Sequence, residues 1–329
     1  MMTTDENKNV YTDGLLDEEL WAVRLNEVAH QKPQRRSQVM RAIENNFQED
    51  PMLEEEKPRF KLLTRAELHA MPDPEWIVPE VLAADSFAVL YGAPGAAKSF
   101  MALDLACSIA SGYTFHGAAV KRGQVLVSVG EGLRGMKWRE EAWTLAHQEA
   151  DTDALDRNLH ILPRAVHLLE EREAEMFINT AEYIAQTSDE PLRLVIIDTL
   201  ARAMVGGDEN SAKDMGMAVD VCERIRRATG ATVLAVHHSG VEGTRERGST
   251  SLRGAADTSI MMQKEDGSNN IIFSPRKMKD YETPAPRQFI LSQYGHSAVL
   301  LPQTVPAGYV PGAVFRKKKE DFQWGREPF

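Results

Sequence analysis

Short apolar runs alternate with longer amphipathic stretches through the middle of the chain. The apolar runs predict four strands, over residues 87–91, 124–129, 192–197 and 232–236. The amphipathic stretches predict helices over residues 99–111, 135–150, 171–187 and 212–229. Because the run 194–197 is apolar on both faces, it suits a parallel sheet with helices on both sides. The pattern therefore predicts an α/β fold around a mostly parallel, twisted sheet.

The two ends of the chain differ from this middle part. Four shorter apolar runs, over residues 259–263, 270–274, 288–292 and 298–301, predict C-terminal β-hairpins. Residues 1–60 are charge-rich, with amphipathic stretches at 15–28 and 39–47, and we expect an acidic arm that is partly helical or disordered. The expected organisation is this arm (1–60), one core domain (61–302) and a flexible tail (303–329).

The composition fits a single large core. The chain has 329 residues, 43% of them hydrophobic, and its two cysteines, Cys107 and Cys222, fall in apolar helical patterns that suit small buried side chains. No apolar run approaches the roughly 20 residues that span a bilayer. We therefore expect a soluble, cytoplasmic protein without a membrane partner.

The charge limits how the chain could bind nucleic acid. A formal charge of −11 argues against a protein that coats nucleic acid with its whole surface, because phosphate contacts require clustered Lys and Arg. Acidic residues gather before the core, whereas several basic residues come late in the chain. If DNA binds, we expect it to contact the second half.

The strongest chemical motif follows the first predicted strand and opens a helix. It consists of Gly92, Ala93, Pro94, Gly95, Ala96, Ala97, Lys98 and Ser99, followed by Phe100. In this context the backbone amides can cradle phosphates, the Lys98 ammonium can reach the β- and γ-phosphates, and the Ser99 hydroxyl can bind Mg²⁺. The motif predicts ATP and Mg²⁺ as ligands. Ala97 stands where glycine is usual, so its methyl group could crowd the phosphate or require a different turn.

Three polar positions follow other predicted strands. Asp198 ends the run 194–197, where a carboxylate can lie near the Mg²⁺. Glu131 follows the strand 124–129 and could activate the attacking water. His237 and His238 follow the strand 232–236. Neighbouring residues on a strand point to opposite sides, so we interpret this pair as a γ-phosphate sensor rather than a metal site.

Over about residues 76–281 these motifs, in this order, resemble the RecA-like superfamily, and within it the RepA-type hexameric replicative DNA helicases of plasmids and phages. The matching segments include YGAPGAAKSF, VGEG, IIDTLAR, DENS, AVHHSG and RGSTSLRGAAD. The resemblance implies a RecA-like ATPase domain over residues 61–302. It also implies a ring of subunits with ATP at each interface, in which Lys98 grips the phosphates, Glu131 is the base, Asp198 lies at the metal and His238 is the sensor.

The same resemblance implies that the loop 239–253 faces a central channel. Arg245, Arg247 and Arg253 occur there among glycines and serines, a composition that suits contact with the phosphates of single-stranded DNA. A solvated basic loop is the alternative interpretation.

Such a ring needs a cation from the neighbouring subunit. Asp257 falls near the position of the arginine finger in RepA-type helicases, and it cannot supply that charge. Lys277 and Lys279 resemble the paired basic residues of DnaB-type helicases, and Arg253 is a third candidate.

Three functions stay open at this stage. The first is a helicase or translocase on single-stranded DNA in phage or plasmid replication. The second is a recombination mediator or nucleotide-regulated loader that binds DNA without unwinding it. The third is a signalling ATPase whose acidic arm recruits a protein, and in the helicase the same arm could bind a replication partner.

Overall fold

The computed structural model describes residues 62–238 and 250–303. The chain divides into two compact units, Met1–Met71 and Pro72–Phe329, and each is described by itself. In the first unit, the short helix α3 (Arg65–His69) begins with a capping box, in which the Thr64 hydroxyl accepts a hydrogen bond from the Glu67 amide at 3.2 Å. The amphipathic stretches predicted at 15–28 and 39–47 lie outside the described residues.

The second unit is built around one large sheet. Its strands are β3 (Phe87–Gly92), β4 (Gln124–Val129), β5 (Leu159–Leu162), β6 (Leu192–Asp198), β7 (Thr232–His238), β8 (Thr258–Lys264), β9 (Asn270–Met278), β10 (Arg287–Tyr294) and β11 (Ser297–Gln303). Within the described residues their order is β11-β10-β9-β8-β3-β7-β6-β4-β5. The strands from β8 to β5 in this order run parallel, and β9, β10 and β11 are antiparallel. The predicted α/β fold with C-terminal hairpins is confirmed.

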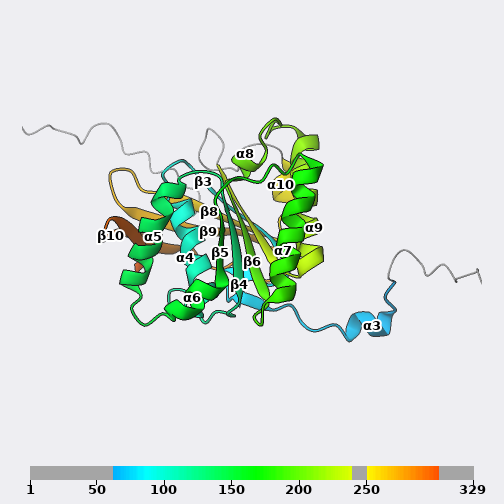
Figure 1. Cartoon of the computed structure of the whole chain (residues 1–329), viewed down its shortest axis with the longest axis horizontal. Coiled ribbons are helices and arrows are strands. Elements are labelled where there is room, and N and C mark those ends of the chain that lie inside the picture. Colours follow the sequence, from blue (N-terminus) through cyan, green and yellow to red (C-terminus); the bar gives the residue numbers. More distant parts are fainter. Residues whose placement is uncertain (1–61, 239–249, 304–329) are drawn as a thin grey trace, which may run out of the picture. The chain divides into compact units, whose positions relative to one another are not determined.

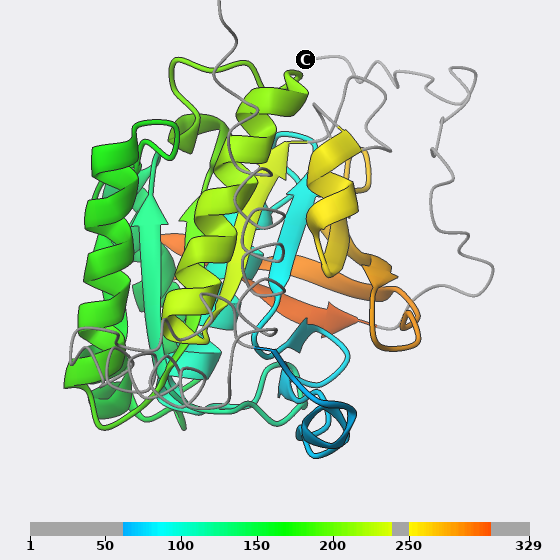
Figure 2. The ribbon, with the colours of Figure 1, turned by 90° about the vertical axis from the view of Figure 1, so that its right-hand side faces the viewer.

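Helices cover both faces of this sheet, as Figures 1 and 2 show. One face packs against α4 (Lys98–Ser111), α5 (Leu133–Ala146) and α6 (Thr152–Asn158), and the opposite face against α7 (Glu171–Thr187), α9 (Ala212–Thr229) and α10 (Thr250–Ala255). The short helix α8 (Leu200–Ala203) follows β6. Helix α9 is capped at its amino end by Ser211, whose hydroxyl accepts a hydrogen bond from the Asp214 amide. At its carboxyl end Gly230 adopts a left-handed conformation.

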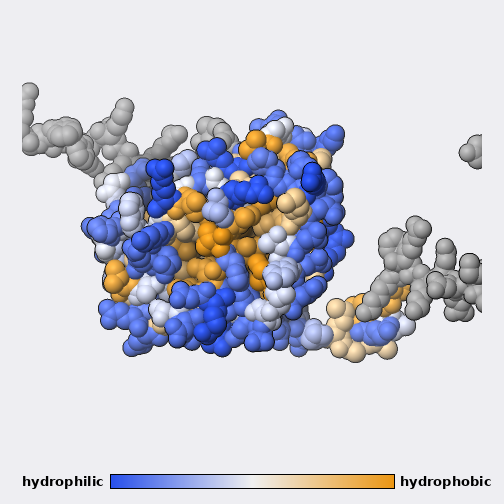
Figure 3. All heavy atoms as spheres, in the orientation of Figure 1, coloured by the Kyte–Doolittle hydropathy of each residue, from blue (hydrophilic) through white to orange (hydrophobic). Residues whose placement is uncertain are grey.

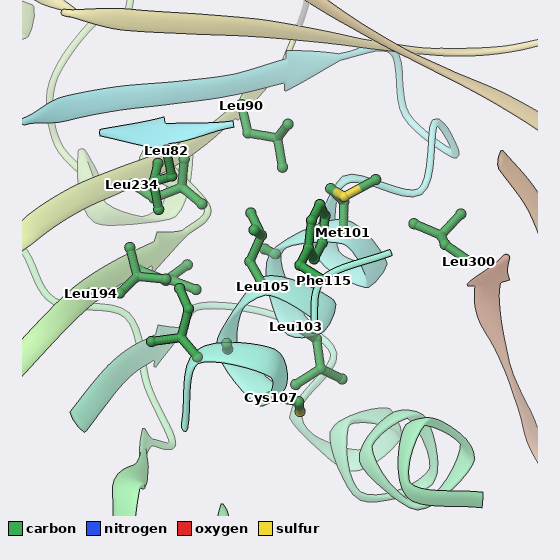
Figure 4. Close-up of a cluster of buried hydrophobic side chains, with 14 of the residues drawn as sticks. Leu82, Leu90, Met101, Leu103, Leu105, Cys107, Phe115, Leu194, Leu234 and Leu300 are labelled. Atoms are coloured by element: carbon green, nitrogen blue, oxygen red, sulfur yellow. The ribbon is translucent and has the colours of Figure 1, made fainter. Parts of the chain in front are cut away.

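Successive side chains of the central strands point to opposite faces of the sheet, so they form two hydrophobic cores. In β3, Leu90 packs toward α4, whereas its neighbour Val89 packs toward the α7–α9 face. Figure 4 shows Leu90, Leu194 and Leu234, from three neighbouring strands, beside Leu105 of α4. Burying each such leucine contributes roughly 1.5–3 kcal/mol, so the central strands are held firmly on both sides.

Two smaller antiparallel strands, β1 (Trp76–Val78) and β2 (Leu82–Ala83), pair with each other. The strand β5 forms one edge of the large sheet, and its four residues are all half-buried. Figure 3 shows hydrophobic residues gathered in the middle of the face that contains this edge, with polar residues around them. The sequence pattern did not predict β5 or α6, and the helix expected over 135–150 is α5, which ends at Ala146.

Candidate functional site

The carboxyl ends of four parallel strands meet at one edge of the sheet. In the strand register, Gly92 of β3 lies beside His238 of β7, Val129 of β4 beside Asp198 of β6, and Asp198 beside Val236 of β7. Gly92 also lies against β8, where a Cβ atom added to it would come 2.2 Å from a backbone oxygen. Only glycine fits this close approach, so the phosphate loop leaves the sheet at a fixed place.

The phosphate loop continues directly into α4. The Lys98 ammonium is buried and donates hydrogen bonds to the carbonyl oxygens of Gly92 at 3.0 Å and Ala93 at 3.1 Å. Burial lowers the pKa of Lys98, and the charges of Asp198 and Glu131 oppose that shift. The ammonium therefore lies close to both acids and is held inside the loop.

Ala97, at the position where glycine is usual, adopts a left-handed backbone conformation. Its φ of 61° and ψ of 25° lie in the left-handed region, which glycine adopts at no steric cost. An alanine there costs roughly 1–2 kcal/mol of backbone strain. Its methyl group is buried in the core, which offsets part of that cost.

Asp198 carries the features expected of a metal ligand. Burial raises the pKa of its carboxyl group, whereas a hydrogen bond with Ser99 and the charges of Arg139 and Lys98 lower it. Among the described residues, its Oδ1 atom is buried without a hydrogen-bond partner, as is the hydroxyl oxygen of Thr199. Oxygen atoms without donors suit a hard divalent cation such as Mg²⁺, so the Ser99 and Asp198 side chains fit the predicted ion.

The loop and several strand ends together line one hollow of about 280 Å³. Its lining includes Pro94, Gly95, Ala97, Lys98, Ser99, Phe100, Glu131, Arg139, Thr199, His238 and Leu291. The predicted base, the predicted sensor and the phosphate loop are thus brought together. His237, in contrast, is fully buried in the sheet beside Tyr91.

Glu131 sits in a short loop between β4 and α5. Its carboxylate forms an ion pair with the Arg202 guanidinium of α8 at 3.4 Å. Both side chains are about half exposed, so this pair is weak. The glutamate can therefore exchange this partner for water or substrate at little cost.

The predicted trans-acting cations lie elsewhere. The Lys277 ammonium donates to the carbonyl oxygens of Arg253 at 3.2 Å, Gly254 at 3.1 Å and Ala256, and so closes the end of α10. Lys279 pairs with Asp257 at 3.1 Å. The register places Met278 opposite Thr258, and Thr258 beside Ala88 at the amino end of β3. Both lysines are therefore far along the sheet from the phosphate loop of their own chain.

The predicted DNA contacts are only partly described. Arg245 and Arg247 lie outside the described residues. Arg253 is exposed on α10 and does not line the hollow. Its role as a DNA contact or as a finger stays a prediction.

Three lining residues were not predicted in any role: Arg139 of α5, Thr199 after β6 and Leu291 of β10. The only sequence signal for Arg139 is its spacing, four residues after Gly135 and seven after Gly132, which places all three on one helix face. Within the described part of the chain, no group of three His, Cys, Asp or Glu residues is placed to hold a metal ion.

Comparison with known families agrees with this geometry. Residues 53–244, more than half of the 329-residue chain, match a family described as an AAA domain. The chain belongs to this family. The AAA domain is a P-loop NTPase related to RecA-like ATPases and to phage and plasmid helicases, so this protein is an ATPase of the P-loop type. The match does not single out the RepA type.

The AAA domain match contains the phosphate loop, Glu131, Asp198 and His238, and it ends before Arg253, Lys277 and Lys279. A comparison with curated proteins found no match. In residues 62–238 and 250–303, no helix has both the length and the hydropathy to cross a membrane.

Proposed function

We propose that this AAA domain protein is an ATP-dependent helicase or translocase of RepA type, acting on single-stranded DNA in phage or plasmid replication in the cytoplasm. The observation that supports the proposal most is the single hollow lined by Lys98, Ser99, Glu131 and His238. In this arrangement the phosphate grip, the base and a reporter at a strand end all contact one ligand.

Each residue has one task in the proposed hydrolysis. Lys98 exchanges the carbonyl oxygens of Gly92 and Ala93 for phosphate oxygens of ATP. Glu131 accepts a proton from water as the water oxygen attacks the terminal phosphorus, and ADP leaves. Mg²⁺, when held by Ser99 and Asp198, supplies positive charge beside the phosphates.

His238 connects this chemistry to DNA. It lines the hollow and is the last residue of β7. The residues that follow it in the sequence include Arg245 and Arg247 and lead to Arg253 on α10. A change of contact at His238 on loss of the terminal phosphate can therefore shift the loop that follows it. Arg245 and Arg247 in that segment, with Arg253 on the helix that follows it, would then shift along the DNA backbone.

The proposed protein works as a homo-oligomer, with a hexameric ring as the expected form. Lys277 and Lys279 lie at the opposite end of the sheet from their own phosphate loop, so any nucleotide that they contact would belong to another subunit. In this proposal the acidic arm at residues 1–60 binds a replication partner.

Strand separation tests the proposal. A forked DNA with one labelled strand is incubated with the protein and ATP, and the particle mass is measured on the same sample. The proposal expects ATP-dependent release of the strand by an oligomer, and no release by Lys98→Ala. Filaments that bind DNA without releasing a strand would instead favour the mediator or loader function.

A further inference from the structure

Arg139 lines the nucleotide hollow but has no part in the proposed hydrolysis. It belongs to α5 and is half-buried. Its guanidinium carbon lies 5.1 Å from the centroid of the Phe100 ring, a distance at which a cation is attracted to the ring face. Phe100 directly follows Ser99 of the phosphate loop, so this contact fixes the guanidinium beside the loop.

Two glycines lie against the same guanidinium, at distances where an added Cβ atom would make ordinary van der Waals contact with it. A Cβ atom added to Gly132 would come 3.4 Å from the Nη2 atom of Arg139, and one added to Gly135 would come 3.6 Å from it. Side chains of a helix lean toward its amino end, which here is the end that reaches the hollow. Arg139 therefore packs along bare backbone toward the site instead of extending into solvent.

The charge of Arg139 already acts on the site. It lowers the pKa of Asp198, as Lys98 also does, whereas Glu131 raises it. Among the described lining residues, Lys98 and Arg139 are the permanent cations, and Lys98 is engaged with loop carbonyl oxygens. Lys277 and Lys279 make their contacts elsewhere. A bound triphosphate would add negative charge to the hollow, and among the described residues Arg139 is the cation besides Lys98 that lines it.

We infer that Arg139 is a nucleotide-contacting residue of the same subunit, which pairs with the terminal phosphate of ATP and so distinguishes ATP from ADP. The inference rests on the proposed ATP hydrolysis at this site. Guanidinium groups bind phosphate oxygens through two parallel hydrogen bonds, and such contacts are stronger than those between neutral groups. Stacking on Phe100 keeps the group in place before ATP arrives, which reduces the entropy lost on binding.

Nucleotide binding in the absence of DNA tests this inference. The affinities of a non-hydrolysable ATP analogue and of ADP, each with Mg²⁺, are measured by calorimetry for the wild type, Arg139→Ala and Arg139→Lys. We expect Arg139→Ala to weaken the ATP analogue roughly 10- to 100-fold and ADP less than about three-fold. Lysine keeps the charge without the two-nitrogen fork, so Arg139→Lys is expected to lie between.

Arg134→Ala is the matched control, because Arg134 is exposed on the same helix and does not line the hollow. It should leave both affinities unchanged. Should Arg139→Ala fail to fold, Arg139→Gln, which keeps most of the length, carries the same expectation. Unchanged affinities, or an equal loss for both nucleotides, would overturn the inference. If DNA does not change the rate of ATP hydrolysis but Arg139→Ala still weakens the ATP analogue more than ADP, the helicase function is refuted and the role of Arg139 stands.

Discussion

Gly92 and His238 are direct neighbours across the parallel pair β3–β7. Gly92 opens the phosphate loop, and His238 precedes the segment of the sequence that carries Arg245 and Arg247, so one step across the sheet separates the phosphate loop from the residue before the proposed DNA contacts. The sheet fixes this distance because β3 is buried between β7 and β8. The proposed coupling through His238 therefore needs a single step between neighbouring strands.

Replacing His238 with alanine should separate hydrolysis from DNA. The side chain lines the hollow without belonging to the phosphate loop, so we expect the affinity for ATP to change less than about three-fold. The rate of hydrolysis with DNA should fall to the rate without DNA. Steady-state kinetics with and without single-stranded DNA measure both effects, and a variant that DNA still stimulates would count against the sensor role.

Asp198→Asn should stabilise the protein while weakening the proposed Mg²⁺ site. Burial raises the pKa of Asp198, so the ionised carboxylate costs folding free energy, and this cost grows as the pH rises through the raised pKa. The amide lacks the charge, and we expect a higher Tm than wild type at neutral pH, with a gain that shrinks toward acid pH. Mg²⁺-dependent nucleotide binding should be lost.

Asp104→Asn is the control for this comparison. Asp104 is also buried, but its two oxygens contact the Trp143 indole at 2.8 Å and the His116 imidazole at 2.7 Å. Breaking that network should lower the Tm by several degrees, because a buried polar contact is lost without relief of an unpartnered charge. A lower Tm for Asp198→Asn than for the wild type at neutral pH would show that the ionised Asp198 carboxylate does not cost folding free energy.

Glu131→Gln should lower kcat about 100-fold or more while ATP still binds, because the amide cannot accept the proton of the attacking water. Arg202→Ala serves as its comparison. The Glu131–Arg202 ion pair is half exposed and worth at most about 1 kcal/mol, so kcat should change less than about five-fold. Rapid-mixing measurements of phosphate release separate the two variants. Equal defects would mean that Arg202 takes part in the chemistry itself.

Mixing inactive variants tests whether Lys279 serves a neighbouring subunit. Lys98→Ala removes the phosphate grip and Lys279→Ala removes the proposed cation from the other end of the sheet. In a mixed ring some interfaces join an intact loop to an intact Lys279, so we expect the mixture to recover roughly a quarter of wild-type hydrolysis if subunits mix at random and act independently. A mixture of Lys98→Ala with Glu131→Gln should recover nothing, since both residues belong to one subunit's site.

Much of the fold was accessible from the sequence because its central strands are apolar on both faces. The strands predicted over 124–129 and 192–197 are β4 and β6, each within one residue. The edge strand β5 and the preceding helix α6 were missed. Their 11 residues, Thr152–Asn158 and Leu159–Leu162, are too short to show a period, and β5 is only half-buried.

The sequence predicted the location of the candidate site residues that follow strands directly. Glu131, Asp198 and His238 all come at or just past the carboxyl end of a parallel strand, and parallel strands present these ends at one edge. Arg139 and Leu291 reach the hollow from the second turn of a helix and from an antiparallel strand. Their positions depend on how α5 and β10 pack around the loop, which local pattern does not encode.

The rate of ATP hydrolysis with and without single-stranded DNA tests the proposed function most directly. For the wild type we expect a low basal rate that DNA raises at least ten-fold, and for Lys98→Ala no hydrolysis in either condition. The same DNA added to a variant of the exposed Arg134 should stimulate it as it does the wild type. Hydrolysis that is unaffected by DNA, or that persists without the Lys98 ammonium, would contradict a DNA-driven motor working through this hollow.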